Sequence, residues 1–176
     1  MNNQAGITAF DIQRCVQRDL LKRKAVVIPN CYWAGHEADL LAFTTRGLVI
    51  DVEVKLTRAD FKADAKKDKW WHTWYRAAPE QRRPREWPPR VWRHYFVMPA
   101  EIWDPKLEAC AASPASGIVT IALAPSGIPK YRVKRRCRPN PQARPVDTRD
   151  WLELARLANL RMWDALAALD LGLRTP

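Results

Sequence analysis

Two runs of alternating apolar and polar residues, 37–44 and 48–56, predict a pair of β-strands joined by a tight turn. The loop between them ends in Gly47, which readily adopts the left-handed conformation that a three-residue hairpin loop prefers. This loop pairs Thr44 with Leu48 and so sets the register of the whole hairpin. One face of the hairpin is then entirely apolar and is expected to lie in the core: Ala38, Leu40, Ala42, Ile50, Val52 and Val54.

The rest of the chain alternates between helical and strand patterns. Apolar residues at helical spacing predict helices over residues 8–23, 58–75 and 147–170. Further strands are predicted over 24–33, 91–98, 118–123 and 128–134, the last two as a hairpin across residues 125–127. Pro29 places the first of these strands at a sheet edge or a bulge. This order predicts an α/β fold in which a central mixed β-sheet is flanked by helices.

The chain has 176 residues, 47% of them hydrophobic and 28% charged, which suits one domain spanning 1–176 and excludes wholesale disorder. The four cysteines are widely spaced, so a disulfide scaffold or a zinc site is not expected. No apolar run approaches the roughly 20 residues of a membrane span. The first ten residues lack a basic segment followed by an apolar one, so no secretory signal is expected. We therefore expect a cytoplasmic protein, nucleoid-associated at most, without a membrane partner.

Positive charge is concentrated in two segments. The net charge is +11, with six arginines against two glutamates in residues 76–94 and seven basic residues without an acid in 130–145. The first of these segments includes a Pro/Arg/Trp-rich insertion, residues 77–90, whose four prolines predict a surface loop. A basic excess confined to two stretches predicts a polyanionic partner, with nucleic acid as the leading candidate.

The second face of the predicted hairpin is acidic at one end. Its register places Asp39 opposite Glu53 and Glu37 opposite Lys55, and opposed like charges destabilise a sheet unless a cation compensates them. Mg²⁺ or Mn²⁺ held by Asp39 and Glu53 would do so, and Lys55 lies near enough to hold or deprotonate a metal-bound water. The alternative is a solvated strand face with an ordinary ion pair.

Three further residues near this acidic face are accessory candidates. Asp51 shares the face and is either an additional ligand or a structural residue. Glu37 is a candidate through its place opposite Lys55. His36 lies close to Asp39 in the sequence and is a candidate for proton transfer.

Residues 37–55, EADLLAFTTRGLVIDVEVK, resemble the core of the PD-(D/E)XK nuclease superfamily. The resemblance implies a restriction-endonuclease-like core, metal ligation by Asp39, Glu53 and the backbone carbonyl of Val54, and Lys55 beside the attacking water. The following residues, VEVKLTRADFKADAK, resemble the MmcB-like DNA repair family, as does RHYFVMPAEI at 93–102. The proline of the superfamily name is absent before Asp39.

Several basic and aromatic residues are candidates for nucleic-acid contact. Lys62, Lys66 and Lys69 fall on one face if residues 58–75 form a continuous helix. Trp87 and Trp92 flank the proline pair of the insertion and are candidates for stacking on bases. The candidate phosphate contacts in the two basic segments are Arg82, Arg83, Arg85, Lys134, Arg135, Arg136 and Arg138.

Together these patterns predict a Mg²⁺- or Mn²⁺-dependent DNA nuclease, a phosphodiester hydrolase acting in DNA repair or processing, with Asp39, Glu53 and Lys55 as its catalytic residues. Binding is expected to be structure-selective or independent of sequence. Two alternatives stay open: a non-catalytic DNA- or junction-binding module on the same fold, and an RNA-directed nuclease. The apolar last helix leaves a homodimer open as well.

Overall fold

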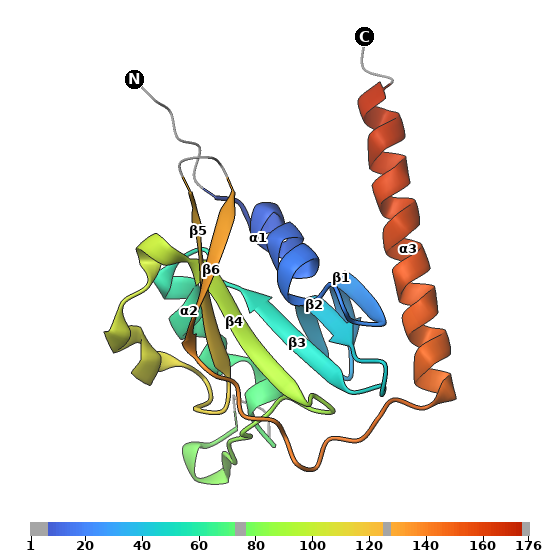
Figure 1. Cartoon of the computed structure of the whole chain (residues 1–176). Helices are drawn as coiled ribbons and strands as arrows, with labels where there is room; N and C mark the ends of the chain where they lie inside the picture. Colours follow the sequence, from blue (N-terminus) through green and yellow to red (C-terminus); the bar gives the residue numbers. More distant parts are fainter. Residues whose placement is uncertain (1–6, 73–76, 125–127, 174–176) are drawn as a thin grey trace.

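The computed structural model describes residues 7–72, 77–124 and 128–173, which form an α/β fold around a six-stranded mixed sheet (Figure 1). The strand order follows the chain, from β1 at one edge to β6 at the other. Strands β1 to β3 are antiparallel, β3 to β5 are parallel, and β6 is antiparallel to β5. The strands are β1 (Val26–Trp33), β2 (His36–Phe43), β3 (Val49–Val54), β4 (Arg93–Pro99), β5 (Gly117–Leu123) and β6 (Pro129–Arg135). The predicted class is confirmed, and Pro29 lies in an edge strand as expected.

The β2–β3 hairpin has the predicted register over its paired length. Thr44 N donates to Leu48 O at 2.9 Å, and the pairing runs from Phe43–Val49 to Leu40–Val52. Gly47 has φ +74°, a left-handed conformation that favours glycine, and a Cβ there would lie in tight contact with Val146 N, at 3.3 Å. The ladder ends before Asp39 and Glu53, so the two acids are not partners in it.

Helix α1 (Ala9–Cys15), continued by the π-helical turn Val16–Leu20, covers one face of the sheet. Thr8 and Asp11 form a capping box at its start, which satisfies two backbone N–H groups. This first face carries five of the six residues predicted for the core: Leu40, Ala42, Ile50, Val52 and Val54. Ala38 differs, because β2 is paired there with Cys31 of β1 and packs with it on the second face.

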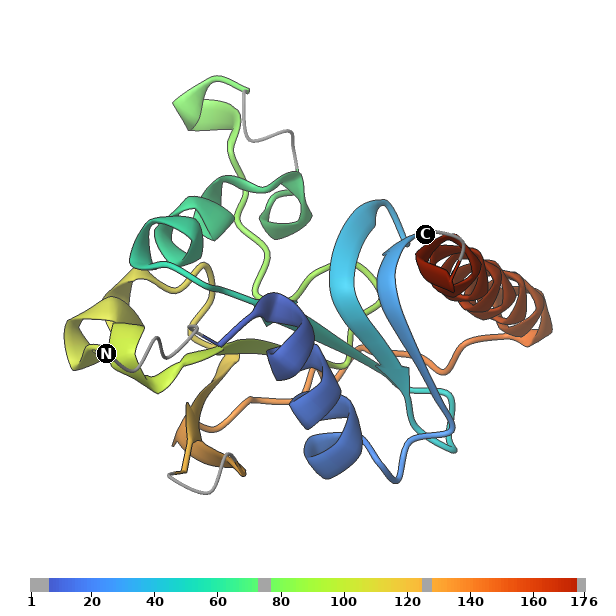
Figure 2. The same ribbon diagram turned by 90° about the horizontal axis from the view of Figure 1, so that it is seen from above.

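The second face carries two separate apolar clusters. The α3 cluster includes Phe43 and Val49 of the hairpin with Trp33 and Leu154, and the α2 cluster includes Phe61, Trp70, Phe96 and Met98. Figure 2 shows α2 and α3 on either side of the centre of the sheet, with α1 on the opposite face. The strip of sheet between the two clusters is where the polar residues of β3 lie.

The helix predicted over residues 58–75 is much shorter than expected. Helix α2 spans Arg58–Ala63 and is capped by Thr57, whose side chain accepts from Asp60 N. Two 3₁₀ turns follow, Asp64–Lys66 and Asp68–Trp70, while Tyr75 lies outside the described residues. The extended residue between the turns, Lys67, redirects the chain so that Lys69 and Trp70 enter the core. Tertiary burial of Trp70 outweighs the helical propensity of this segment.

The connection from β4 to β5 forms two 3₁₀ turns, Ala100–Ile102 and Pro105–Cys110. The Pro/Arg/Trp-rich insertion is a loop, as predicted, with one further 3₁₀ turn at Pro79–Gln81. The connection between β5 and β6, residues 125–127, lies outside the described residues.

Helix α3 (Thr148–Leu173) is packed on the sheet only along its first part. Trp151, Leu154 and Leu157 contact the α3 cluster, with the Trp151 and Phe43 ring centroids 5.7 Å apart. Beyond Ala158 the helix projects from the domain and exposes Leu160, Met162, Trp163, Leu166 and Leu169 (Figure 1). The homodimer stays a prediction, for which this exposed segment offers surface. None of the helices within the described ranges is long and apolar enough to cross a membrane.

Candidate active site

Asp51, Glu53 and Lys55 point to the second face of the sheet, in the strip between the two apolar clusters. They alternate along β3 with Ile50, Val52 and Val54, which face α1, so the strand periodicity places the three on one side. Asp51 is fully buried, and Glu53 and Lys55 are each 2% exposed. Charged groups that are buried this deeply require partners of opposite charge in direct contact. Residues of the turns after α2 provide several of these partners.

Lys55 lies between two carboxylates. Its Nζ is 2.9 Å from Glu53 Oε2 and 2.7 Å from Asp64 Oδ1. Asp64 belongs to the first 3₁₀ turn after α2, and its other oxygen accepts a hydrogen bond from Trp70 Nε1 at 2.8 Å. Burial raises the pKa of Asp64, but the nearby ammonium groups of Lys69 and Lys55 hold it well below its usual range. The Lys55 ammonium is therefore held between two anions in a fixed orientation.

Two more lysines join this cluster. Lys69 Nζ lies 2.5 Å from Glu53 Oε1 and 3.4 Å from Asp51 Oδ2. Lys67 Nζ lies 3.0 Å from Glu53 Oε2 and 3.1 Å from Asp64 Oδ1, and its side chain is half-exposed. Burial raises the pKa of Glu53, yet the Lys69 ammonium brings it below the ordinary value. Both oxygens of Glu53 are thus already bound to ammonium groups.

The prediction that Lys69 lies on a nucleic-acid-binding helix face is wrong. The helix ends at Ala63, and Lys69 is turned inward and 4% exposed. Neither its role as an ion-pair partner nor that of Lys67 followed from the sequence pattern. The available clue was electrostatic, because two acids on one face of a buried strand need cations from elsewhere in the chain.

Asp39 stands beside Glu53 where the hairpin ladder ends. Its Oδ2 accepts a hydrogen bond of 2.7 Å from the Val54 backbone N–H. Lys55 N donates to Val97 O in β4, so by the alternation of a strand both backbone groups of Val54 point the other way, toward Asp39. Burial and then the negative charge of Glu53 raise the pKa of Asp39. Asp39 therefore lies against the Val54 backbone and close enough to Glu53 to be affected by its charge, although the two acids are not partners in the β2–β3 ladder.

Asp51 lies deeper, between two histidines. His36 Nε2 is 3.3 Å and His94 Nε2 is 3.8 Å from Asp51 Oδ2. Burial raises the pKa of Asp51, but the nearby Lys69 ammonium lowers it well below its usual range. Asp51 Oδ1 and both ring nitrogens of His36 are buried without a hydrogen-bond partner. This position supports the structural interpretation of Asp51, and it places His36 against Asp51 rather than at a reacting centre.

Glu37 does not contact Lys55. The expected pair fails because the β2–β3 ladder ends at Leu40–Val52, and Glu37 instead pairs with Tyr32 of β1 and is exposed. Lys55 takes Glu53 and Asp64 as its partners.

His94 is a buried titratable group that the sequence did not single out. It is fully buried between the Trp70 and Phe96 rings, with centroids 4.8 and 4.6 Å away, and its Nδ1 lies 3.0 Å from Ser116 Oγ. Burial lowers the pKa of His94 to about 4. At neutral pH the imidazole is therefore uncharged, and it adds no positive charge beside Asp51.

We expect His94 to make folding sensitive to mild acid. Its pKa is about 4 in the folded protein and about 6.5 in the unfolded chain, so below pH 6.5 protons bind preferentially to the unfolded form. The stabilisation from keeping His94 neutral is fully present above pH 6.5. Roughly 3 kcal/mol of the free energy of unfolding is lost as pH falls from 6.5 to 4. Urea unfolding in EDTA at pH 7.5, 6 and 5 measures it, with His94→Gln as the comparison. An equal loss of stability in the variant would show that other groups cause the acid sensitivity.

The oxygen donors at the end of β3 suit a hard divalent cation, with one condition. Asp39, Glu53 and the Val54 carbonyl provide two carboxylates and a backbone oxygen, the kind of set that Mg²⁺ uses together with water. Burial, and after it the nearby charge of Glu53, raises the pKa of Asp39, and a cation between the two carboxylates would lower it again. Glu53 would have to release Lys67, the one half-exposed ammonium among its partners. No group of three or more His, Cys, Asp or Glu side chains arranged for a metal is present in the described part of the chain.

The remaining lysine and insertion candidates fall into two groups. Lys62, Lys66 and Arg83 are exposed, so they are available to a polyanion. Arg82 and Arg85 are half-buried and their Nε atoms donate to the backbone carbonyls of Ala77 and Trp71, at 3.0 and 2.7 Å. Part of the basic insertion therefore holds its own loop in place.

The second basic segment is largely exposed. Lys134 and Arg136 are open to solvent, whereas Arg135 donates to the carbonyls of Ser116 and Ser113, and Arg138 forms an ion pair with Glu86. Strand β6, which carries Lys134, lies at the sheet edge and is separated from β3 by β4 and β5. At about 4.8 Å per strand this edge lies roughly 14 Å from the candidate site, within the width of a duplex.

Neither Trp87, in the insertion, nor Trp92, two residues after it, is fully exposed. Trp87 is half-buried and its Nε1 donates to Arg138 O at 3.0 Å. Trp92 packs against the first-face core and lies under the Arg93 guanidinium, 4.3 Å from the ring centroid. Base stacking by these residues stays a prediction.

Comparisons with known proteins identify a similar fold only. No protein-family model matches the chain, and no curated protein matches it. The chain is similar to a solved structure described as "SPO1766 protein of unknown function from Silicibacter pomeroyi", with a TM-score of 0.57 and 16% sequence identity. The similarity covers 98% of this chain and 97% of that one. The whole arrangement thus recurs in a distant protein, and function must be argued from the site.

Proposed function

We propose that this protein is a Mg²⁺- or Mn²⁺-dependent DNA nuclease on a restriction-endonuclease-like core, related to the PD-(D/E)XK superfamily and nearest to the MmcB-like DNA repair family. The observation that supports the proposal is the convergence of Asp39, Glu53 and Lys55 where the β2–β3 ladder ends. Two carboxylates and an oriented ammonium are the protein groups that metal-assisted phosphodiester hydrolysis needs.

In this proposal some residues of the chain bind the metal ion and others contact the water or the phosphate. A bound divalent ion supplies a nucleophile at neutral pH and positive charge for the developing phosphorane. Asp39, Glu53 and the Val54 carbonyl would hold the ion. Lys55 donates two of its three N–H groups to Glu53 and Asp64 and lies 3.9 Å from Asp60 Oδ1, so the third N–H would be available to the attacking water or a phosphate oxygen. Lys67 would have to leave Glu53 for the ion to bind.

The substrate contacts in this proposal are electrostatic. The net charge of +11 and the exposed basic side chains around the domain favour a nucleic-acid backbone. Lys62 and Lys66 belong to α2 and the turn after it, so they are the nearest candidates to Lys55 in the chain. Contacts to phosphate carry no sequence information, so binding independent of sequence or selective for DNA structure is expected.

One observation favours a second function, a DNA- or junction-binding module without cleavage. Each oxygen of Glu53 is paired with an ammonium group, which is a self-compensated arrangement that needs no metal. An RNA-directed nuclease is a third candidate, since metal and phosphate contacts do not recognise the 2′-hydroxyl.

A cleavage assay tests the proposal. Labelled single-stranded, duplex, flapped and four-way-junction DNA, and RNA of the same sequence, are incubated with Mg²⁺, Mn²⁺ or EDTA. We expect products from DNA with either metal and none in EDTA. Salt-sensitive binding of every DNA without products would support the binding module, and preferential cleavage of RNA would support the third candidate. The Asp39→Asn variant is tested beside the wild type, and Asp164→Asn, which loses an exposed acid on α3, is its control.

A further inference from the structure

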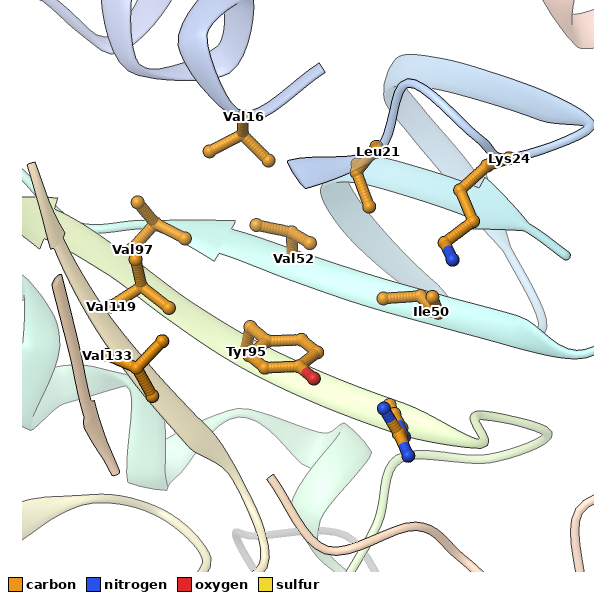
Figure 3. A pocket seen from close by; sticks show the side chains of 10 residues that line it. Val16, Leu21, Lys24, Ile50, Val52, Tyr95, Val97, Val119 and Val133 are labelled. Atoms are coloured by element: carbon orange, nitrogen blue, oxygen red, sulfur yellow. The ribbon is translucent and has the colours of Figure 1, made fainter. Parts of the chain in front are cut away.

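A pocket of 230 Å³ lies on the face of the sheet opposite the candidate active site (Figure 3). Its floor is formed by β3, β4 and β5, and the π-helical turn after α1 and the edge strand β6 border it. Ten side chains line it: Val16, Leu21, Lys24, Ile50, Val52, Arg93, Tyr95, Val97, Val119 and Val133. The proposed nuclease chemistry uses none of them.

The strand register gives this pocket a polar end and an apolar end. Along β3 and β4 the paired residues are Ile50 with Arg93, Val52 with Tyr95, and Val54 with Val97. Figure 3 shows the Lys24 side chain reaching toward Ile50, which is the Arg93 end. It shows four valines gathered at the other end: Val16, Val97, Val119 and Val133. The lining therefore changes from polar to apolar along the direction of the strands, so an elongated ligand would lie parallel to them.

The cations at the polar end lack acidic partners. Neither Lys24 nor Arg93 forms an ion pair with any carboxylate of the described residues, and no acid lines the pocket. Arg93 stacks on the Trp92 ring, and its Nε is buried without a hydrogen-bond partner. A buried donor without a partner costs free energy, and an anion placed beside it would recover that cost.

We infer that this pocket binds a small monocarboxylate with an unbranched apolar tail of five to seven carbons. The carboxylate would lie between Lys24 and Arg93, and the tail would cover Val52 and end among the valines. At about 30 Å³ per water, the pocket holds roughly eight water molecules, which matches a ligand of about eight to ten non-hydrogen atoms. The tail supplies affinity by removing apolar surface from water, and the carboxylate supplies orientation.

Titration of the full chain with octanoate tests this inference, by calorimetry and by protein NMR. We expect a dissociation constant below about 1 mM for octanoate, a value at least tenfold weaker for n-octylamine, and no measurable binding of acetate. Absence of octanoate binding up to 10 mM overturns the inference. Equal affinity for octanoate and n-octylamine also overturns it, because the pocket would then select only the tail.

Two variants test the ends of the pocket separately. Lys24→Gln is expected to weaken octanoate binding at least fivefold, whereas Lys22→Gln, a matched change at an exposed lysine two residues earlier, leaves it unchanged. Val133→Asp puts a negative charge at the apolar end on an exposed position of β6, and it is expected to weaken binding by a similar factor. Equal effects of the two lysine variants would overturn the assignment of Lys24.

Discussion

Replacing Lys69 with methionine is expected to lower the free energy of unfolding by about 3 to 5 kcal/mol, the range for removing one partner of a buried ion pair. Lys69 is 4% exposed and its ammonium is shared between Glu53 and Asp51. Methionine fills nearly the same volume as lysine, so the loss of stability would come from the missing charge. Without Lys69, Glu53 would keep the ammonium groups of Lys55 and Lys67, whereas buried Asp51 would lose its lysine partner.

The matched control for this substitution is Lys66→Met, which removes the same charge from an exposed position of the preceding turn. Its stability is expected to stay within about 0.5 kcal/mol of the parent protein. Chemical denaturation at pH 7.5, followed by tryptophan fluorescence and circular dichroism, measures both. If the two variants unfold at the same denaturant concentration, the Lys69 ion pairs contribute nothing to stability.

Replacing Asp39 with asparagine is expected to reduce metal-dependent cleavage by about 1000-fold, equivalent to about 4 kcal/mol of transition-state stabilisation. Asparagine keeps an oxygen that can accept the hydrogen bond from Val54 N–H, so the local backbone is expected to persist. It removes the negative charge and with it one of the two proposed carboxylate ligands. The effect rests on the proposed function and is measured as initial rates on the preferred DNA with Mg²⁺.

Two further measurements on the same variant separate a catalytic effect from a folding effect. Because burial and Glu53 raise the pKa of Asp39, removing its charge relieves repulsion, so stability in EDTA is expected to be unchanged or higher. Affinity for DNA in EDTA is expected to stay the same or increase, since an acid is lost near the backbone path. A variant that cleaves at the parental rate would exclude Asp39 as a metal ligand.

The hairpin carrying the candidate site was predictable because its information is local. Three turn residues and the alternation on either side set the register from Phe43–Val49 to Leu40–Val52. The period of two then placed Asp51, Glu53 and Lys55 on one face and the core residues on the other. The expectations that failed, Glu37 opposite Lys55 and Ala38 on the first face, lie beyond the point where the β2–β3 ladder ends. Where hydrogen-bonded pairing stops, the register no longer constrains the side chains.

The partners of the buried acids were not predictable in the same way. Residues 58–70 have a helical pattern and alternating charges, from which Lys62, Lys66 and Lys69 appeared equivalent. In the structure, burial of Trp70 against Phe96 and His94 ends the regular helix early and turns Lys69 inward, while Lys66 remains exposed. The helix propensities of neighbouring residues contain no information on how much apolar surface a tryptophan buries against strands distant in sequence.

By itself, the sequence determined the α/β class, the register of the central hairpin, the acidic side of β3 and the basic character of the surface, because each depends on local periodicity or on summed charge. Only the tertiary structure decided which cations meet those acids, that Arg135 and Arg138 are already engaged, and that Lys24 and Arg93 share a pocket with distant valines. Those outcomes depend on contacts between residues far apart in the chain. Burial makes such contacts strong, because a charge removed from water must find its partner within a few ångströms.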